Sequence, residues 1–198
     1  MIGGGGCALE IISFLQESQI EVLGYIALED VGFLYEVPYI GYSIGKYDSD
    51  SVNFYIASGS PFVREAMFKE VRLKGMSPRS FIHPKSYTSP RSFFDPLGVI
   101  VYPGATINAG ALIGSNCLIN CGVSIGHGAV ITGNCRIGDD VTIGPGAVVL
   151  DRLVVNDGAF ITSGSIVARD VPAGGHVTGN FAIEHKSFLR DWLRKIRY

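Results

Sequence analysis

The sequence predicts a mixed fold, in which a small parallel α/β domain precedes a solenoid of short parallel strands and a C-terminal helix. Three observations predict it. Strand-like and helix-like segments alternate over the first eighty residues. An Ile or Val then recurs every six residues from Val101 to Val167. The tail places apolar side chains on one helical face. We expect the three parts to span residues 1–80, 81–183 and 184–198.

Composition excludes several classes of protein. The chain has 198 residues, 47% of them hydrophobic, which is enough for a substantial core. A net charge of −2 offers no basic field for nucleic acid. No apolar run approaches the roughly 18 residues of a membrane span, and no secretory leader is evident, so we expect a cytoplasmic protein. Its four cysteines form no CxxC pair and are expected to be reduced thiols.

The first eighty residues predict two helices and two buried strands. The run GCALEIISFL after the glycines has a helical pattern of apolar residues. Residues 21–26 and 53–58 read as buried strands. A second helix follows, with Ser60 as its N-cap, Pro61 in the first turn and Gly75 past its end. This alternation indicates a small parallel sheet.

A glycine cluster opens this domain and indicates a nucleotide site. Glycines before a helix let backbone N–H groups approach a phosphate at the helix N-terminus. Glu29 and Asp30 follow the next strand, where a carboxylate can bind ribose hydroxyls. We expect a nucleotide or nucleotide sugar here; the alternative is a tight structural turn with two solvated acids. In nucleotide-binding α/β folds a strand precedes the glycine turn. Here only Met1 and Ile2 precede the glycines, so we expect most of that strand to be absent.

A period of six residues dominates the rest of the chain. Its apolar positions are Val101, Ile107, Ile113, Ile119, Ile125, Ile131, Ile137, Ile143, Val149, Val155, Ile161 and Val167. Four residues after each stands a small or aliphatic residue at every step. A period of six fits neither a helix nor a plain strand. It fits a three-sided coil of 18 residues, stacked at about 4.8 Å, with about four coils. Cys117 and Cys135 should then stack on one face as small core residues.

The repeat resembles the hexapeptide-repeat, left-handed parallel β-helix acyltransferases over residues 83–183. With the glycine-rich α/β part and the FIHP junction at residues 81–84, nearly the whole chain resembles the sugar O-acyltransferase family. That family includes the sialic acid O-acetyltransferases and the bacterial nucleotide-4-amino-sugar N-acetyltransferases. The resemblance implies that the α/β domain binds a nucleotide sugar, that the β-helix forms a homotrimer, and that acetyl-CoA lies between neighbouring β-helices. It implies no metal and these substrate-binding residues: Gly4, Gly5, Gly6, Cys7, Glu29, Asp30, Ser58, Gly59 and Arg64.

His127 is the candidate catalytic base. The family motif places an Asn, then six residues, a His and an acid; Asn120 and His127 match, and Gly128 stands at the acidic position. Neutral imidazole, with a pKa near 6.5, can accept the proton of an attacking amine or hydroxyl, typically worth about 10² to 10⁴ in rate. Its orienting partner would be a backbone carbonyl, Asp139, Asp140 or a group on another subunit. Because an amine can attack before it loses its proton, N-acylation is favoured.

The resemblance also indicates where acetyl-CoA would lie. Backbone N–H groups of Gly144 and Gly146 are candidate donors to the thioester oxygen. The pantetheine arm should pass Ile161, Ser163 and Gly164. The turn TGNFA, which contains Asn180, resembles the Gly-Asn-Pro-Ala turn near the adenine end, with phenylalanine in place of proline.

The sequence is also compatible with other functions. A metalloenzyme like the γ-class carbonic anhydrases needs three converging histidines, and only His127 lies within the coils. A non-catalytic nucleotide-sugar sensor or scaffold is a second alternative, and O-acetylation of sialic acid or another sugar a third. Cys7, which stands where the family has a histidine, has no visible partner for a nucleophilic role. The basic, amphipathic tail either packs against protein or lies on a membrane surface.

Overall fold

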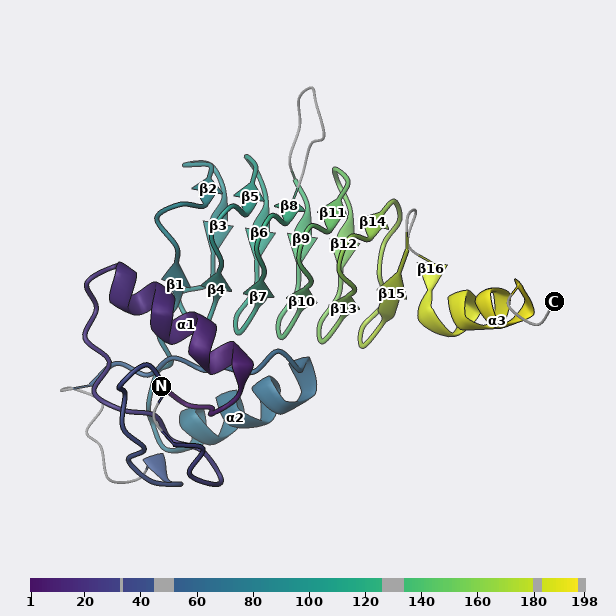
Figure 1. The fold of residues 1–198 in the computed structure, drawn as a ribbon. Helices are drawn as coiled ribbons and strands as arrows, with labels where there is room; N and C mark the ends of the chain where they lie inside the picture. The colour runs from purple at the N-terminus through teal and green to yellow at the C-terminus, as the bar shows by residue number, and fades with distance from the viewer. Residues whose placement is uncertain (33, 45–51, 126–133, 180–182, 196–198) are drawn as a thin grey trace.

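The computed structural model describes residues 1–32, 34–44, 52–125, 134–179 and 183–195. An elongated solenoid forms the body of the molecule (Figure 1). The α/β unit lies beside its first coils, and a C-terminal helix extends from the opposite end (Figure 1). The predicted order of α/β unit, parallel solenoid and terminal helix is confirmed.

The solenoid is built from very short strands arranged in three sheets. Parallel strands β1, β4, β7, β10, β13 and β15 form the seven-stranded sheet, to which β16 adds antiparallel. The second sheet has the order β14-β11-β8-β5-β2, and the third has the order β12-β9-β6-β3. The strands are β1 (Phe81–Ile82), β2 (Tyr87–Thr88), β3 (Phe93–Phe94), β4 (Ile100–Val101), β5 (Thr106–Ile107), β6 (Leu112–Ile113), β7 (Leu118–Ile119), β8 (Ser124–Ile125), β9 (Arg136–Ile137), β10 (Thr142–Ile143), β11 (Val148–Val149), β12 (Val154–Val155), β13 (Phe160–Ile161), β14 (Ile166–Val167), β15 (His176–Thr178) and β16 (Ile183–Glu184).

The six-residue pattern forms the core of the solenoid. The described Ile and Val positions from Val101 to Val167 are buried in one hydrophobic cluster. Small residues four positions later, such as Ala105 and Ala147, belong to the same cluster. Fully burying one such branched side chain is worth about 1.5–3 kcal/mol, so stacked coils stabilise one another mainly through this interior. This part of the sequence prediction is confirmed for the described residues.

The number of coils differs from the prediction, because the first coil is out of phase. Val101 pairs with Ile82 on one side, 19 residues away, and with Ile119 on the other, 18 residues away. The first coil therefore does not continue the phase of six backwards from Val101, and its strands β2 and β3 end in Thr88 and Phe94. Six parallel strands stack in the seven-stranded sheet, which gives about five turns instead of four.

One coil contains an insertion that the sequence pattern hides. Ile119 pairs with Ile143 and Ile125 pairs with Val149, so partners are 24 residues apart here instead of 18. The extra length lies between β8 and β9, where residues 126–133 are outside the described part. An insertion of one whole hexapeptide preserves the phase of six, so stepping along the sequence does not reveal it.

This insertion makes one prediction wrong. Cys117 directly precedes β7 in the seven-stranded sheet, whereas Cys135 precedes β9 in the four-stranded sheet, so the two do not stack on one face. Both are nevertheless buried, and each Sγ donates to a backbone carbonyl, Cys117 to Gly138 and Cys135 to Leu150. None of the four cysteines, all of which lie in the described ranges, forms a disulfide bond.

The α/β unit holds its short parallel segments around Ile2. Ile2 forms parallel bridges with both Ile26 and Ile56, and Tyr25 bridges Tyr39 on the outer side. The two predicted strands are thus confirmed only as single-residue bridges. Helix α1 (Gly6–Glu17) packs its buried face, Ala8, Ile11, Ile12 and Leu15, into a cluster with Phe81, Ile100 and Leu118 of the solenoid. The unit therefore rests on the seven-stranded sheet.

Helices α2 (Pro61–Leu73) and α3 (His185–Lys195) match the sequence prediction. The Ser60 hydroxyl accepts a hydrogen bond from the Val63 N–H, and Gly75 follows α2 with φ +75°. The Glu184 carboxylate accepts bonds from the Lys186 and Ser187 N–H groups at the start of α3. Within the described ranges, no helix combines the length and apolar character that a membrane span requires.

Candidate functional site

The glycine turn brings together three loops at one edge of the parallel segments. A Cβ on Gly3, whose φ is +123°, would lie 2.3 Å from the Ala57 carbonyl oxygen. A Cβ on Gly4 would lie 3.0 Å from Cβ of Ala27 and 3.3 Å from Cγ2 of Val31. The glycine turn therefore contacts both residues 27–32 and residues 57–60. In parallel α/β sheets this edge, at the carboxyl ends of the strands, is where ligands bind.

The N-terminus of α1 is open to an anion. Gly5 is the N-cap and contributes no side-chain cap, and no acidic residue occupies the first turn. A Cβ on Gly5 or Gly6 would meet no atom within 4 Å, so space adjoins the helix start. Uncapped N–H groups and the helix dipole together favour a negative group at such a position.

The two acids of the next loop have different environments. Asp30 Oδ1 accepts hydrogen bonds of 2.8 Å from the Tyr25 hydroxyl and from the Gly32 N–H. The same hydroxyl accepts from the Val31 N–H at 3.1 Å. Both acids are exposed, and Asp30 orders the loop through these bonds. Of this pair, Glu29 is the carboxylate that is not used in ordering the loop.

Arg64 is fully buried between α2 and the solenoid. Its Nε donates to the Asn116 carbonyl at 2.7 Å, and Nη1 donates to Thr142 Oγ1 at 2.8 Å and to the Ser58 carbonyl at 3.2 Å. Nη2 donates to the carbonyls of Asp140 and Val141, at 2.8 and 3.0 Å. A guanidinium has five N–H donors, and these five bonds use them all. Arg64 thus has no donor left for a substrate phosphate in this arrangement, although Ser58 and Gly59 beside it are partly accessible.

Tyr102 joins the glycine turn to the solenoid, although no sequence pattern points to this residue. Its hydroxyl donates to Glu10 Oε2 at 3.0 Å and lies 3.5 Å from Cys7 Sγ. Burial raises the pKa of Cys7 and the pKa of Tyr102. A raised thiol pKa disfavours the thiolate, so the geometry offers no activation of Cys7 as a nucleophile.

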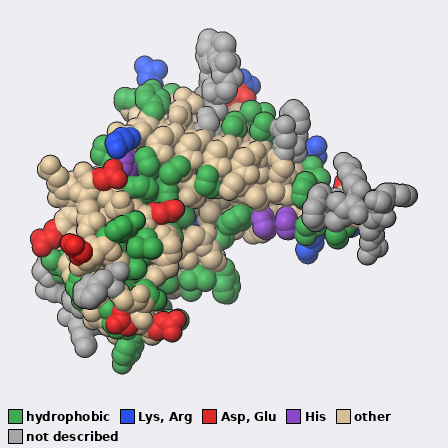
Figure 2. Space-filling view, in the orientation of Figure 1, with side chains coloured by type: hydrophobic (Ala, Val, Ile, Leu, Met, Phe, Trp, Pro, Cys, Tyr) green, Lys and Arg blue, Asp and Glu red, His purple; other side chains and the backbone are tan. Residues whose placement is uncertain are grey.

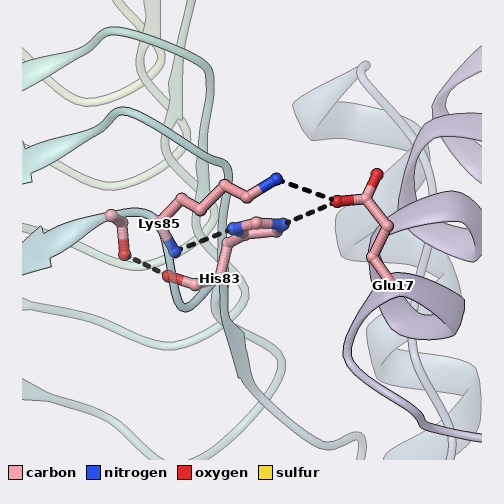
Figure 3. Close-up of polar contacts among 4 residues, drawn as sticks. Glu17, His83 and Lys85 are labelled. Carbon is pink, nitrogen blue, oxygen red and sulfur yellow. Dashed lines mark hydrogen bonds and ion pairs between the residues drawn. The ribbon is translucent and has the colours of Figure 1, made fainter.

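His83 packs beneath the C-terminal end of α1. Figure 3 shows its ring between Lys85 and Glu17. Nδ1 accepts the Lys85 N–H at 3.0 Å, and Nε2 lies 3.9 Å from Glu17 Oε2. The side chain is only 3% exposed and meets the edge of Phe14. These contacts give it a structural role at the junction.

His127, with Gly128, lies outside the described residues. Its expected partner Asn120 is half-buried, and its Nδ2 donates to the Ile143 carbonyl of the next coil at 3.2 Å. Asn108 and Asn156 make the same bond to the coil above them. This contact of Asn120 is therefore a feature of the repeat that requires no catalytic role.

The predicted cofactor residues mostly serve the solenoid backbone. The N–H groups of Gly144 and Gly146 donate to the carbonyls of Ile161 and Cys121, at 2.8 and 3.0 Å. Both N–H groups are thus engaged within the solenoid, and their role as donors to a thioester oxygen stays a prediction. Ile161 is fully buried in the core, and the Gly164 N–H donates to Pro145. Ser163 is exposed, and Asn180 lies outside the described residues.

The two aspartates considered as partners of His127 are also engaged within the solenoid. Asp139 Oδ1 accepts the Ser115 N–H at 2.7 Å. Asp140 Oδ1 accepts a bond of 2.6 Å from Asn116 Nδ2, and burial raises the pKa of Asp140. Each still has a second carboxylate oxygen, so neither is removed as a partner for a group from another subunit.

A groove of about 670 Å³ lies beside the N-terminus of α2. It is lined by Ser60, Pro61, Phe62, Glu65, Asp140, Asp157, Gly158, Phe160, Gly174 and His176. His176 also stacks on His185, with ring centroids 4.1 Å apart, and Figure 2 shows a pair of histidine side chains near α3. Their sequence spacing matched no motif, so this stack was not foreseen. In the part of the chain with described coordinates, no three His, Cys, Asp or Glu side chains are grouped to hold a metal ion.

The repeat region has a known family model. The model for the bacterial transferase hexapeptide, six repeats, matches residues 117–151 and 134–169. Residues 117–169 of the solenoid are bacterial transferase hexapeptide repeats. The hexapeptide-repeat family that the sequence resembles is thereby confirmed for this domain. Comparison with curated proteins finds no significant match.

Solved structures resemble both the hexapeptide-repeat domain and the α/β unit. A histidine-to-asparagine variant of perosamine N-acetyltransferase from Caulobacter crescentus, in complex with CoA and GDP-perosamine, is 24% identical, with a TM-score of 0.78 over 92% of this chain and 94% of that one. The acetyltransferase domain of PglB from Neisseria gonorrhoeae is 24% identical, with a TM-score of 0.71 over 92% and 97%. WeeI from Acinetobacter baumannii is 22% identical, with a TM-score of 0.61 over 92% and 97%. At these identities the likeness establishes a shared two-part fold.

Proposed function

We propose that this protein is a cytoplasmic, acetyl-CoA-dependent acetyltransferase of a nucleotide-linked amino sugar, with N-acetylation of a 4-amino-4,6-dideoxy sugar favoured. The observation that carries the proposal is the attachment of an open glycine turn to a hexapeptide-repeat domain. The same two-part fold occurs in a perosamine N-acetyltransferase crystallised with CoA and GDP-perosamine. The α/β unit would bind the nucleotide and the repeat domain the acetyl donor.

The nucleotide end of the acceptor fits the glycine turn. A diphosphate would accept hydrogen bonds from the uncapped N–H groups of α1 at Gly5, Gly6 and Cys7. The exposed Glu29 carboxylate, on the loop that contacts Gly4, would bind ribose hydroxyls. Ser58 and Gly59 complete this edge from the other side.

The groove beside α2 supports an amine acceptor over a hydroxyl acceptor. Among the described residues, its lining includes the carboxylates of Asp140, Asp157 and Glu65, the last paired with Lys69 outside the lining, and no lysine or arginine. Phe62 stands at the same groove with 79% of its surface exposed. Carboxylates and an aromatic face attract a protonated amino group more strongly than a neutral hydroxyl.

The reaction needs a base, and His127 is our candidate. The bound ammonium group first loses one proton to solvent. The neutral amine then attacks the thioester carbonyl, the C–N bond forms, and the C–S bond breaks as CoA leaves as its thiol. The imidazole accepts the amine proton and returns it to the departing sulfur. The strand before this residue, β8, lies in the five-stranded sheet, whereas α1 packs on the seven-stranded one. We therefore expect His127 to act on substrate held by a sister subunit.

Exposed apolar positions on the solenoid support the homotrimer that such shared sites require. Phe93 and Leu112 pair in register on the four-stranded sheet and are 66% and 43% exposed. Tyr87 on the five-stranded sheet is 57% exposed. Parallel sheets normally have both faces covered, so these surfaces suit packing against copies of the same chain.

The test is acetyl transfer to a panel of acceptors. UDP-, dTDP- and GDP-linked 4-amino sugars, their 4-hydroxy analogues and free sialic acid are each incubated with acetyl-CoA. Release of CoA thiol and an acetylated product by mass spectrometry are measured. An amine-specific product supports the proposal, product only from hydroxyl acceptors indicates an O-acetyltransferase, and tight binding without thiol release indicates a scaffold.

Two variants test the catalytic assignments. His127→Ala should lower kcat at least about tenfold, at the low end of general-base effects, while trimer formation and acetyl-CoA binding persist. Unchanged kcat would remove this residue as the base. Asn120→Ala is compared with Asn108→Ala, which loses the same inter-coil bond. If Asn120 is catalytic, only its variant lowers kcat at equal folded fraction.

A further inference from the structure

We infer that Arg64 is a positioning residue, which fixes the loop at residues 58–60 over strand β10 and so sets the geometry of the acceptor site. This inference rests on the proposed function and deepens it. Sequence resemblance placed Arg64 among substrate ligands, but in the structure its guanidinium is buried and bonds to the Asn116 carbonyl and to Thr142 Oγ1 of the solenoid. Its effect on the acceptor would pass through Ser58 and the N-terminus of α2.

The guanidinium bonds to both sides of the junction at once. Nη1 donates to the Ser58 carbonyl in the α/β unit and to Thr142 Oγ1 in the repeat domain. Nη2 donates to two successive carbonyls of the same coil, those of Asp140 and Val141. Two elements held by one rigid planar group cannot slide past each other without losing these bonds.

The choice of arginine at this position points to positioning rather than to stability. Burial lowers the pKa of Arg64, although the charge of the nearby Asp140 carboxylate acts in the opposite direction. All five hydrogen-bond acceptors of Arg64 are neutral oxygens, so no hydrogen-bonded carboxylate offsets the cost of burying its charge. An apolar side chain packed here would avoid that cost. Lysine carries three donors on one nitrogen and cannot reach acceptors spread around a planar fork.

The bonded loop adjoins the acceptor groove. Ser60 and Pro61, which follow Ser58, line the groove together with Asp140, whose carbonyl Arg64 also bonds. A displacement of about 1 Å at a substrate-positioning element can cost about a hundredfold in rate. A small shift of this loop would therefore change acceptor placement while the acetyl-CoA side of the solenoid stays in place.

The experiment compares Arg64→Lys and Arg64→Ala with Arg72→Ala, an exposed arginine on the same helix. For Arg64→Lys we expect kcat/KM for the nucleotide sugar to fall about a hundredfold, while KM for acetyl-CoA changes less than about twofold. Arg72→Ala should match the wild type. For Arg64→Ala, guanidinium ion at non-denaturing concentration should restore activity by about tenfold, since it fits the vacated planar slot. Ammonium at equal ionic strength should not.

A second readout does not depend on catalysis. Amide hydrogen exchange should accelerate in Arg64→Lys at residues 58–63, while exchange in β11 and β14 stays as in the wild type. If both substrates lose affinity together in proportion to the unfolded fraction, and sucrose restores activity as it restores the melting temperature, Arg64 is merely structural and the inference fails. If the wild type turns over no acceptor, the proposed function fails, whereas the exchange pattern still decides whether Arg64 positions the loop.

Discussion

The hydroxyl of Tyr102 donates a hydrogen bond to Glu10 Oε2 over 3.0 Å and so joins the first full repeat of the solenoid to α1. The Tyr102 side chain is 1% exposed, and its ring meets the edge of Phe14 at 4.9 Å. Arg64 makes the corresponding connection from α2. The two helices whose N-termini carry the candidate substrate loops are thus each attached to the solenoid by one buried polar side chain.

Tyr102→Phe should destabilise the protein by about 0.5–1.5 kcal/mol, because it removes the hydrogen bond from the buried Tyr102 to Glu10, an exposed residue whose carboxylate water can then solvate. The free energy of unfolding is measured in urea. Tyr87→Phe is the matched control, since that tyrosine is 57% exposed on the solenoid. Equal stability of the two variants would show that the bond to Glu10 contributes nothing.

Thr142→Val should cost about 1–3 kcal/mol, because it leaves one buried N–H of Arg64 without an acceptor. Thr142→Ser keeps the hydroxyl and should cost less. Thr106→Val, at the same strand position of another sheet, should be nearly neutral. Urea unfolding of the three variants decides the matter; a Thr142→Val protein as stable as Thr106→Val would contradict the arrangement described for the guanidinium.

The free energy of unfolding should decrease as the pH is lowered, because His83 is buried in the folded protein. Burial lowers the pKa of this histidine, and Nδ1 already accepts the Lys85 N–H, so the neutral ring is favoured in the folded protein. The unfolded chain instead takes up a proton near its ordinary pKa of about 6.5. The contribution of neutral His83 to the free energy of unfolding is therefore complete above pH 6.5 and is lost as the pH falls below that value.

The measurement is urea unfolding of the wild type and of His83→Asn between pH 8 and pH 5. Asparagine does not titrate, so the difference in unfolding free energy between the two proteins should shrink as the pH falls. A difference that is constant, or that grows toward acid pH, would show that His83 is protonated readily in the folded state.

Backbone strain at the solenoid corners predicts a stabilising substitution. Arg152 adopts φ +58°, the left-handed conformation that Gly104 adopts at an equivalent corner with φ +73°. Arg152→Gly should raise stability by up to about 1 kcal/mol, because its exposed pair with Asp151 is worth little. Gly104→Ala should cost about 1 kcal/mol, since a Cβ there meets nothing closer than 3.6 Å and only the backbone is strained. Thermal unfolding should give a higher melting temperature for Arg152→Gly and a lower one for Gly104→Ala than for the wild type. A change in the opposite direction for either variant would contradict the predicted strain at these corners.

The sequence by itself determined the solenoid and its interior. An inward-facing Ile or Val every six residues is a local requirement, set by the length of one strand and one corner, and it can be read without any long-range contact. The helix limits at Ser60 and Gly75 are equally local, because capping groups lie within a turn of the residues they serve. The glycine turn before α1 could be predicted in the same way, because it depends only on residues next to each other in the sequence.

Only the tertiary structure decided how these parts meet. An insertion of one whole hexapeptide leaves the phase unchanged, so only the pairing of Ile119 with Ile143 reveals it and separates Cys117 from Cys135. Arg64 bonds residues 52 to 78 positions away, and a period or motif carries no information on such separations. The physical reason is that core burial repeats along the chain, whereas the acceptors of a buried charge are set by which surfaces the folded chain brings together.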